Sequence, residues 1–77
     1  MEQAVQDMAF IFKDFKEFLL KDSEEIEGKV SKLILTSTDT QELNYLMERL
    51  KNNDMLINAI NKWAETASKV LGKDISI

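Results

Sequence analysis

The chain has 77 residues and a mass of 8.9 kDa, which is room for a single domain over residues 1–77. It contains no Cys and no His, so disulfides and the usual zinc sites are excluded. Its formal net charge of −4 provides no basic excess for a phosphate backbone, and we expect no nucleic-acid partner. A domain this small needs very regular packing or association with other chains to be stable.

The charge is unevenly distributed along the chain. Residues 1–27 carry eight acidic and three basic side chains, a net charge of −5, whereas residues 28–77 carry a net charge of +1. The acidic segment is either the solvated face of a helix or a surface that steers a basic partner toward the chain.

The first segment is predicted to be helical. Pro is absent and there are only 2 Gly, so little in the chain would break a helix, and an all-α fold is expected. Apolar residues recur at alternating spacings of three and four, which places them on one helix face. They are Val5, Met8, Phe12, Phe15 and Leu19, followed after an interruption by Ile26, Val30 and Leu33. This pattern predicts a helix over about residues 3–35.

The interruption falls on Asp22-Ser23-Glu24-Glu25, which has the pattern of a capping box. We therefore favour a bend or short break near residue 22, with one unbroken helix as the alternative. A second boundary follows at Ser37-Thr38-Asp39-Thr40, where Thr38 with Gln41 or Asp39 with Glu42 could close a capping box. This boundary predicts a turn at residues 36–40.

The segment after the turn has the clearest periodicity. Nine positions at alternating spacings of three and four form a heptad pattern: Leu43, Leu46, Leu50, Asn53, Ile57, Ile60, Ala64, Ala67 and Leu71. They predict a long, coiled-coil-like helix over about residues 40–71, ended by Gly72. Asn53 is the polar exception. It either fixes the register of the helix pair or marks a loop at residues 52–54.

A second apolar stripe lies beside the first on the same helix, at Leu56, Trp63 and Val70. Two antiparallel helices bury only one face each, so this stripe predicts contact with a third helix or with another subunit. The expected fold is therefore a helical hairpin that associates with other chains. A three-helix bundle, with the first segment folded over both stripes, is the alternative.

The sequence lacks the residues on which most catalytic sites depend. Without His and Cys, only paired carboxylates could serve as acid and base, and pairs such as Asp14 with Glu17 are typical of solvated helix faces. The two glycines are isolated, so no phosphate-binding loop is present. We expect no enzyme activity, no cofactor and no metal site.

Packing against other helices is the expected activity. The Phe-rich part of the first helix is interpreted as core, with a face that docks into a partner's groove as the alternative. The residues expected to carry the interaction are Phe12, Phe15, Leu50, Ile57, Ile60, Trp63 and Leu71.

Three segments suggest a known family: Ser37-Thr38-Asp39-Thr40-Gln41-Glu42-Leu43, Asp54-Met55-Leu56-Ile57-Asn58 and Lys73-Asp74-Ile75. With the layout of a polar turn followed by a long helix, the chain resembles the needle subunits of bacterial type III secretion systems, and more loosely their inner-rod proteins. The resemblance implies a hairpin that polymerises into a hollow tube. It also implies secretion to the cell surface without a cleaved signal.

The sequence therefore predicts a structural or assembly subunit that packs against copies of itself. The alternative is a small chaperone, inhibitor or adaptor that occupies a partner protein through its acidic, Phe-rich first helix. The acidic start and the short apolar runs are unlike a secretory signal or a membrane span, so we expect synthesis in the cytoplasm and no membrane insertion.

Overall fold

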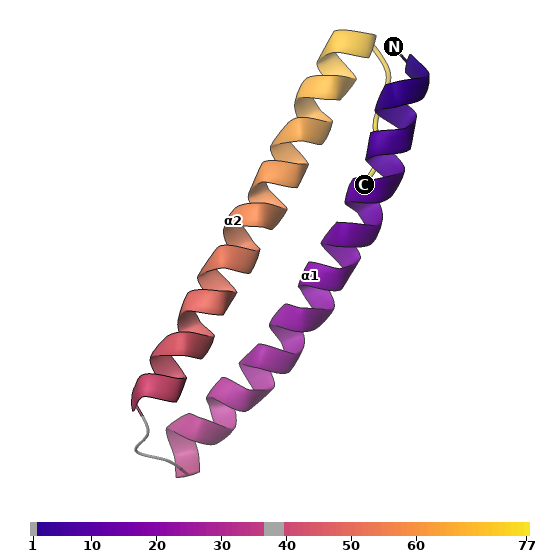
Figure 1. Cartoon of the computed structure of the whole chain (residues 1–77). Coiled ribbons are helices and arrows are strands. Elements are labelled where there is room, and N and C mark those ends of the chain that lie inside the picture. Colours follow the sequence, from indigo (N-terminus) through magenta and orange to yellow (C-terminus); the bar gives the residue numbers. More distant parts are fainter. Residues whose placement is uncertain (1, 37–39) are drawn as a thin grey trace.

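The computed structural model describes residues 2–36 and 40–77. They form two helices, α1 (Glu2–Thr36) and α2 (Thr40–Leu71), followed by a tail at residues 73–77. Figure 1 shows the helices side by side and antiparallel, with both chain ends at the same end of the molecule. The predicted all-α hairpin is confirmed. The three-helix alternative is wrong for the described residues, because α1 extends along α2 instead of folding back on itself.

Helix α1 extends over 35 residues without interruption, which excludes a short break near residue 22 but is compatible with a bend there. The polar residues that resemble a cap have another role. Asp22 and Ser23 accept hydrogen bonds from Arg49 and Asn53 of α2, and they do so from within a continuous helix. Long-range partners have therefore taken the place of the local cap that the sequence pattern suggested.

Helix α2 extends over 32 residues and continues through residues 52–54, as the heptad pattern predicts. All nine predicted positions are buried or half-buried, and Asn53 is only 8% exposed. Gly72 ends the helix with a φ of 66°, a left-handed conformation that glycine adopts without steric cost. The predicted turn at 36–40 and its capping boxes involve residues 37–39, which lie outside the described residues.

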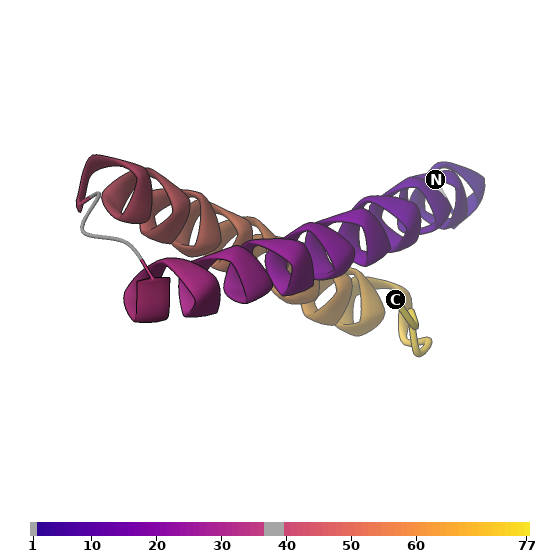
Figure 2. The same cartoon turned by 90° about the horizontal axis from the view of Figure 1, so that it is seen from below.

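The molecule is a rod with extents of 52 × 15 × 15 Å. Its radius of gyration is 16.4 Å, whereas a compact domain of this length would have about 11.5 Å. In the view of Figure 2 the two helices cross at an angle. Since each helix has one helical neighbour, most of its circumference is not covered by the other helix.

The two halves of the rod differ in their cores. We call residues 20–36 and 40–55 the turn-proximal half, and residues 2–19 and 56–77 the terminal half. The turn-proximal half holds an apolar cluster of Ile26, Val30 and Leu46, with Leu33, Leu43 and Leu50 packed against it. Ile26 is only 2% exposed, the lowest value among the buried core residues. The centre of this cluster is as well buried as the core of a larger domain.

We call the positions of each helix that face the other helix the seam. On α1 the seam differs from the predicted one at two positions. Met8 and Phe15 were expected to face α2, but they are 43% and 40% exposed. Ala9 and Lys16 take their places, respectively buried and half-buried. Each residue is the immediate neighbour of the expected one, so the seam is rotated slightly around α1 and an apolar stripe remains exposed beside it.

Candidate functional site

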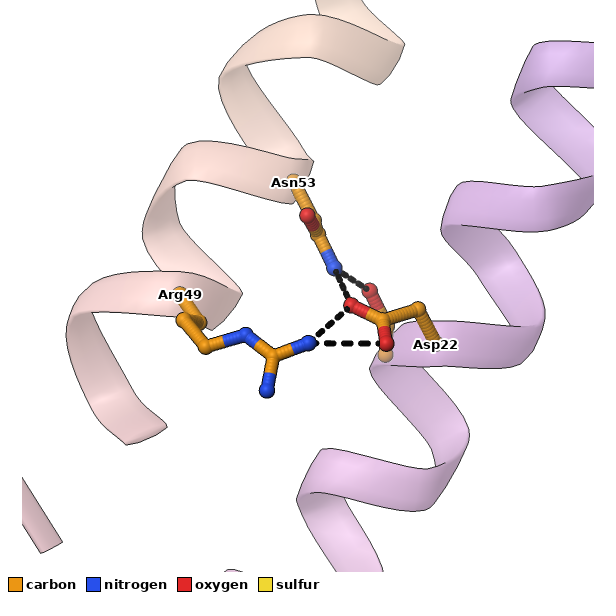
Figure 3. Close-up of polar contacts among 4 residues, drawn as sticks. Asp22, Arg49 and Asn53 are labelled. Atoms are coloured by element: carbon orange, nitrogen blue, oxygen red, sulfur yellow. Dashed lines mark hydrogen bonds and ion pairs between the residues drawn. The ribbon is translucent and has the colours of Figure 1, made fainter. Parts of the chain in front are cut away.

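A polar cluster joins the two helices at the middle of the hairpin (Figure 3). Arg49 Nη2 donates to both carboxylate oxygens of Asp22, at 2.9 and 3.0 Å. Asn53 Nδ2 donates to Asp22 Oδ2 at 2.9 Å and to Ser23 Oγ at 3.2 Å. Because buried polar groups are costly without partners, this cluster favours one alignment of α1 against α2.

The surroundings of Asp22 favour its charged form. The hydrogen bond from Asn53 is the main cause that lowers the pKa of this carboxyl below its ordinary value, and the positive charge of Arg49 acts in the same direction. Desolvation opposes both, because it favours the neutral acid, but it does not outweigh them. At neutral pH the cluster therefore holds an ionised carboxylate.

The Asp22–Arg49 ion pair also identifies one flank of the hairpin. Asp22 follows Phe15 and Met8 at seven-residue intervals, so these three residues share a heptad position on α1. Arg49 is followed at the same interval by Leu56, Trp63 and Val70 on α2. Residues in equivalent heptad positions face the same side, so both apolar stripes lie on the flank that the ion pair marks.

Together these stripes form an apolar surface, which we call the terminal-half face. It consists of Met8, Ile11, Phe15 and Phe18 from α1 and of Leu56, Trp63 and Val70 from α2. Ile11 and Phe18 lie three residues beyond Met8 and Phe15 and so extend the face around α1. Phe18 is 62% exposed and Val70 is 71% exposed. Apart from Trp63, every side chain of this face is at least 40% exposed in the hairpin.

Trp63 connects this face to the seam. Its ring packs edge-on against Phe12, with ring centroids 4.9 Å apart and an interplanar angle of 78°. This is a favourable aromatic geometry, and Trp63 remains half-buried. The base of the face is thus formed by a side chain that the hairpin already holds in place.

The opposite flank of the terminal half is covered by the tail. Ile75 is buried at 6% exposure, and its N–H donates to Ser68 Oγ at 2.8 Å. Lys16 Nζ donates to Asn61 Oδ1 at 2.7 Å and to the carbonyl oxygen of Ile77 at 3.3 Å. Figure 1 shows the tail returning along α1. Only one flank of this half therefore presents a broad apolar surface.

The residues predicted to carry the interaction fall into two groups. Most belong to the contact between α1 and α2: Leu50, Ile57, Ile60 and Leu71 in the seam, and Phe12 against Trp63. Phe15 and part of Trp63 lie on the terminal-half face. Sequence reasoning missed Met8, Ile11 and Phe18 as members of one face with the second stripe of α2. Their shared flank follows from the heptad spacing once the Asp22–Arg49 pair is known.

Residues 2–36 and 40–77 contain no group of three acidic, His or Cys side chains placed to hold a metal ion, and no pocket. Neither described helix has a stretch apolar enough to cross a membrane.

The fold and the face define an antiparallel helical hairpin with one exposed apolar flank. The chain has no significant match to a protein-family model, to a curated protein or to a solved structure.

Proposed function

We propose that this protein is a structural subunit that acts by packing its helices against other chains. The observation that supports this proposal is the terminal-half face, where large apolar side chains from both helices stand exposed on one flank. Contiguous exposed apolar surface of this kind marks contact sites between proteins. Burial of such surface would also supply stability that a two-helix hairpin lacks on its own.

The finer form of the proposal is growth into a filament, as the resemblance to needle subunits implies. Open growth needs a second contact surface besides the terminal-half face, because a single self-complementary surface closes after two subunits. The turn-proximal half offers apolar side chains for a second surface. They are Ile34, Leu35, Tyr45 and Met47, between 51% and 84% exposed.

Light scattering after size-exclusion chromatography, across a hundredfold range of concentration, tests the proposal. We expect the mass to rise with concentration, and negative-stain microscopy of the heaviest fraction to show filaments if growth is open. Phe18→Ser should reduce association. Phe10→Ser is the matched control, because Phe10 is 69% exposed but lies outside the face.

A monomer at every concentration would overturn self-assembly. Folding should then be checked by a cooperative melt. That result would favour the alternative of a module that binds one partner protein through its acidic, Phe-rich first helix.

A further inference from the structure

The terminal-half face is bordered by charges of opposite sign. Asp7 and Asp14, one heptad apart, are exposed along its outer edge on α1. Lys62 and Lys69, also one heptad apart, are exposed along its outer edge on α2, where Lys69 also forms an exposed ion pair with Glu65 at 3.4 Å. One edge of the face is therefore acidic and the other is basic.

These charges lie at matching levels along the rod. Lys16 is hydrogen-bonded to Asn61, which fixes the alignment of the helices at this point. Moving toward the free ends, Asp14 comes two residues after Lys16 and Lys62 comes one residue after Asn61. Asp14 and Lys62 are thus at about the same height. One heptad further, so are Asp7 and Lys69.

The sizes of the side chains match in the same way. On α1 the outer part of the face carries the large residues Ile11 and Phe18. On α2 the equivalent outer positions carry the small, exposed residues Ala59 and Thr66. By the same alignment, Phe18 is level with Ala59, and Ile11 is level with Thr66. Large side chains opposite small ones are what two interdigitating helices require.

We propose that a second copy of this chain covers the terminal-half face, with a two-fold axis parallel to the rod, so that α1 of each copy lies antiparallel along α2 of the other. This inference rests on the proposed function and specifies its partner and geometry. The result is a four-helix bundle around the terminal half. Asp14 faces Lys62 of the second copy, and Asp7 faces Lys69 of the second copy. Phe18 packs over Ala59 of the second copy.

The other symmetric arrangement is disfavoured by the same residues. A two-fold axis across the rod would place α1 against α1 of the second copy. The acidic edges would then meet each other, and Phe18 and Ile11 would have no small residues opposite them. Like charges across an interface oppose association, so charge selects the arrangement of α1 against α2.

Charge reversal tests this arrangement. One variant carries Asp7→Lys and Asp14→Lys, and the other carries Lys62→Glu and Lys69→Glu. In a homodimer of either variant, the edge charges that face each other across the proposed bundle have the same sign. Each variant should therefore associate with itself at least tenfold more weakly than the unaltered chain does. Mixing the two restores opposite charges at every facing pair and should restore association as a heterodimer. All four positions are exposed, and circular dichroism should show unchanged helix content.

Cross-linking gives a second, geometric readout, because the chain contains no Cys of its own. A chain with Asp14→Cys is mixed with a chain carrying Lys62→Cys, and a short bis-maleimide is added. We expect the mixed cross-linked dimer to form in preference to either homodimer.

The outcomes separate the two proposals. An unaltered chain that stays monomeric overturns self-assembly and this arrangement together. An unaltered chain that associates, while the charge-reversed variants associate equally well, overturns only the arrangement. Preferential cross-linking of Asp14→Cys to itself would do the same, because it places α1 against α1.

Discussion

The two halves of the hairpin share one seam but differ in what surrounds it. In the turn-proximal half, Ile26 and Leu46 are almost fully buried, and the flank beside them carries the Asp22–Arg49 ion pair. In the terminal half the same flank is apolar, and Phe18 and Val70 are mostly exposed. The first half holds the apolar cluster inside the chain, although it also exposes Ile34, Leu35 and Met47. The second presents a surface whose burial requires another helix, and this difference locates the proposed activity in the terminal half.

The largest expected effect is in the turn-proximal core. Ile26→Ala removes the centre of the only apolar cluster found among the described residues, and Ile26 is 2% exposed. We expect the free energy of unfolding to fall by about 2–5 kcal/mol, because a cavity adds to the lost burial. Chemical denaturation followed by circular dichroism measures this change.

Leu35→Ala is the matched control for this prediction. Leu35 lies in the same half but is 84% exposed, so its truncation should change the free energy of unfolding by less than about 0.5 kcal/mol. Equal effects of the two substitutions would show that Ile26 is not the centre of a packed core.

The next largest effect is expected in the polar cluster, which lies in the turn-proximal half next to the terminal half. Asn53→Ala removes the donor shared by Asp22 and Ser23, which leaves a buried hydroxyl and a carboxylate with one partner fewer. We expect a loss of about 1–3 kcal/mol in the free energy of unfolding. Asn52→Ala is the control, because Asn52 is exposed on the same turn of α2. A similar loss from both would exclude a structural role for the cluster.

The pattern of α2 could be predicted because its seam is almost entirely apolar. All nine of its heptad positions are buried or half-buried, and Asn53 is the buried polar position in the seam that the pattern allowed. The stripe at Leu56 and Val70 was also predicted to exceed what one partner helix covers, and both residues are exposed. Where the apolar residues form one dominant stripe, spacing alone determines the buried face.

The pattern of α1 was less informative because the seam holds Ala9 and Lys16, while the larger apolar residue Phe15 lies beside it. Met8 and Phe15 are more apolar than Ala9 and Lys16, so hydrophobicity favoured the wrong neighbours. Lys16 enters the seam because Asn61 and the carbonyl of Ile77 accept its hydrogen bonds. Those partners are distant in sequence, as are the partners of Asp22, and local spacing contains no information about them.

Low pH should weaken the polar cluster around Asp22. The pKa of Asp22 lies below its ordinary value of 3.8 in the folded chain, so its contribution to stability is complete above that value and is lost as the pH falls below it. We expect Asp22→Asn to be less stable than the unaltered chain at pH 7. The difference should shrink as the pH falls below 3.8, as followed by denaturation at each pH.

Asp54→Asn is the control for the acid effect, since Asp54 is an exposed carboxylate on α2. Its difference from the unaltered chain should be small at every pH. A difference for Asp22→Asn that stays constant from pH 7 into acid would contradict the role of the charged carboxylate.

The smallest effects compare the two glycines, one in each half. Gly28 lies within α1, and nothing stands within 4 Å of the space that a Cβ would occupy. Gly28→Ala should therefore raise the free energy of unfolding by about 0.5–1 kcal/mol, through better helix propensity. Gly72 also has open space around it, but its φ of 66° is unfavourable for alanine. Gly72→Ala should lower the free energy by about 1 kcal/mol.

The signs of these two changes are more informative than their sizes. Gly72→Ala strains the turn that leads into the tail, so it should also disturb the terminal half around Trp63, the single tryptophan of the chain. Tryptophan fluorescence should then report loosening in Gly72→Ala before the helix signal falls, whereas in Gly28→Ala the two signals should fall together. If both glycine variants gained stability, the tail would not depend on a left-handed residue at position 72. The covered flank of the terminal half would then need another explanation.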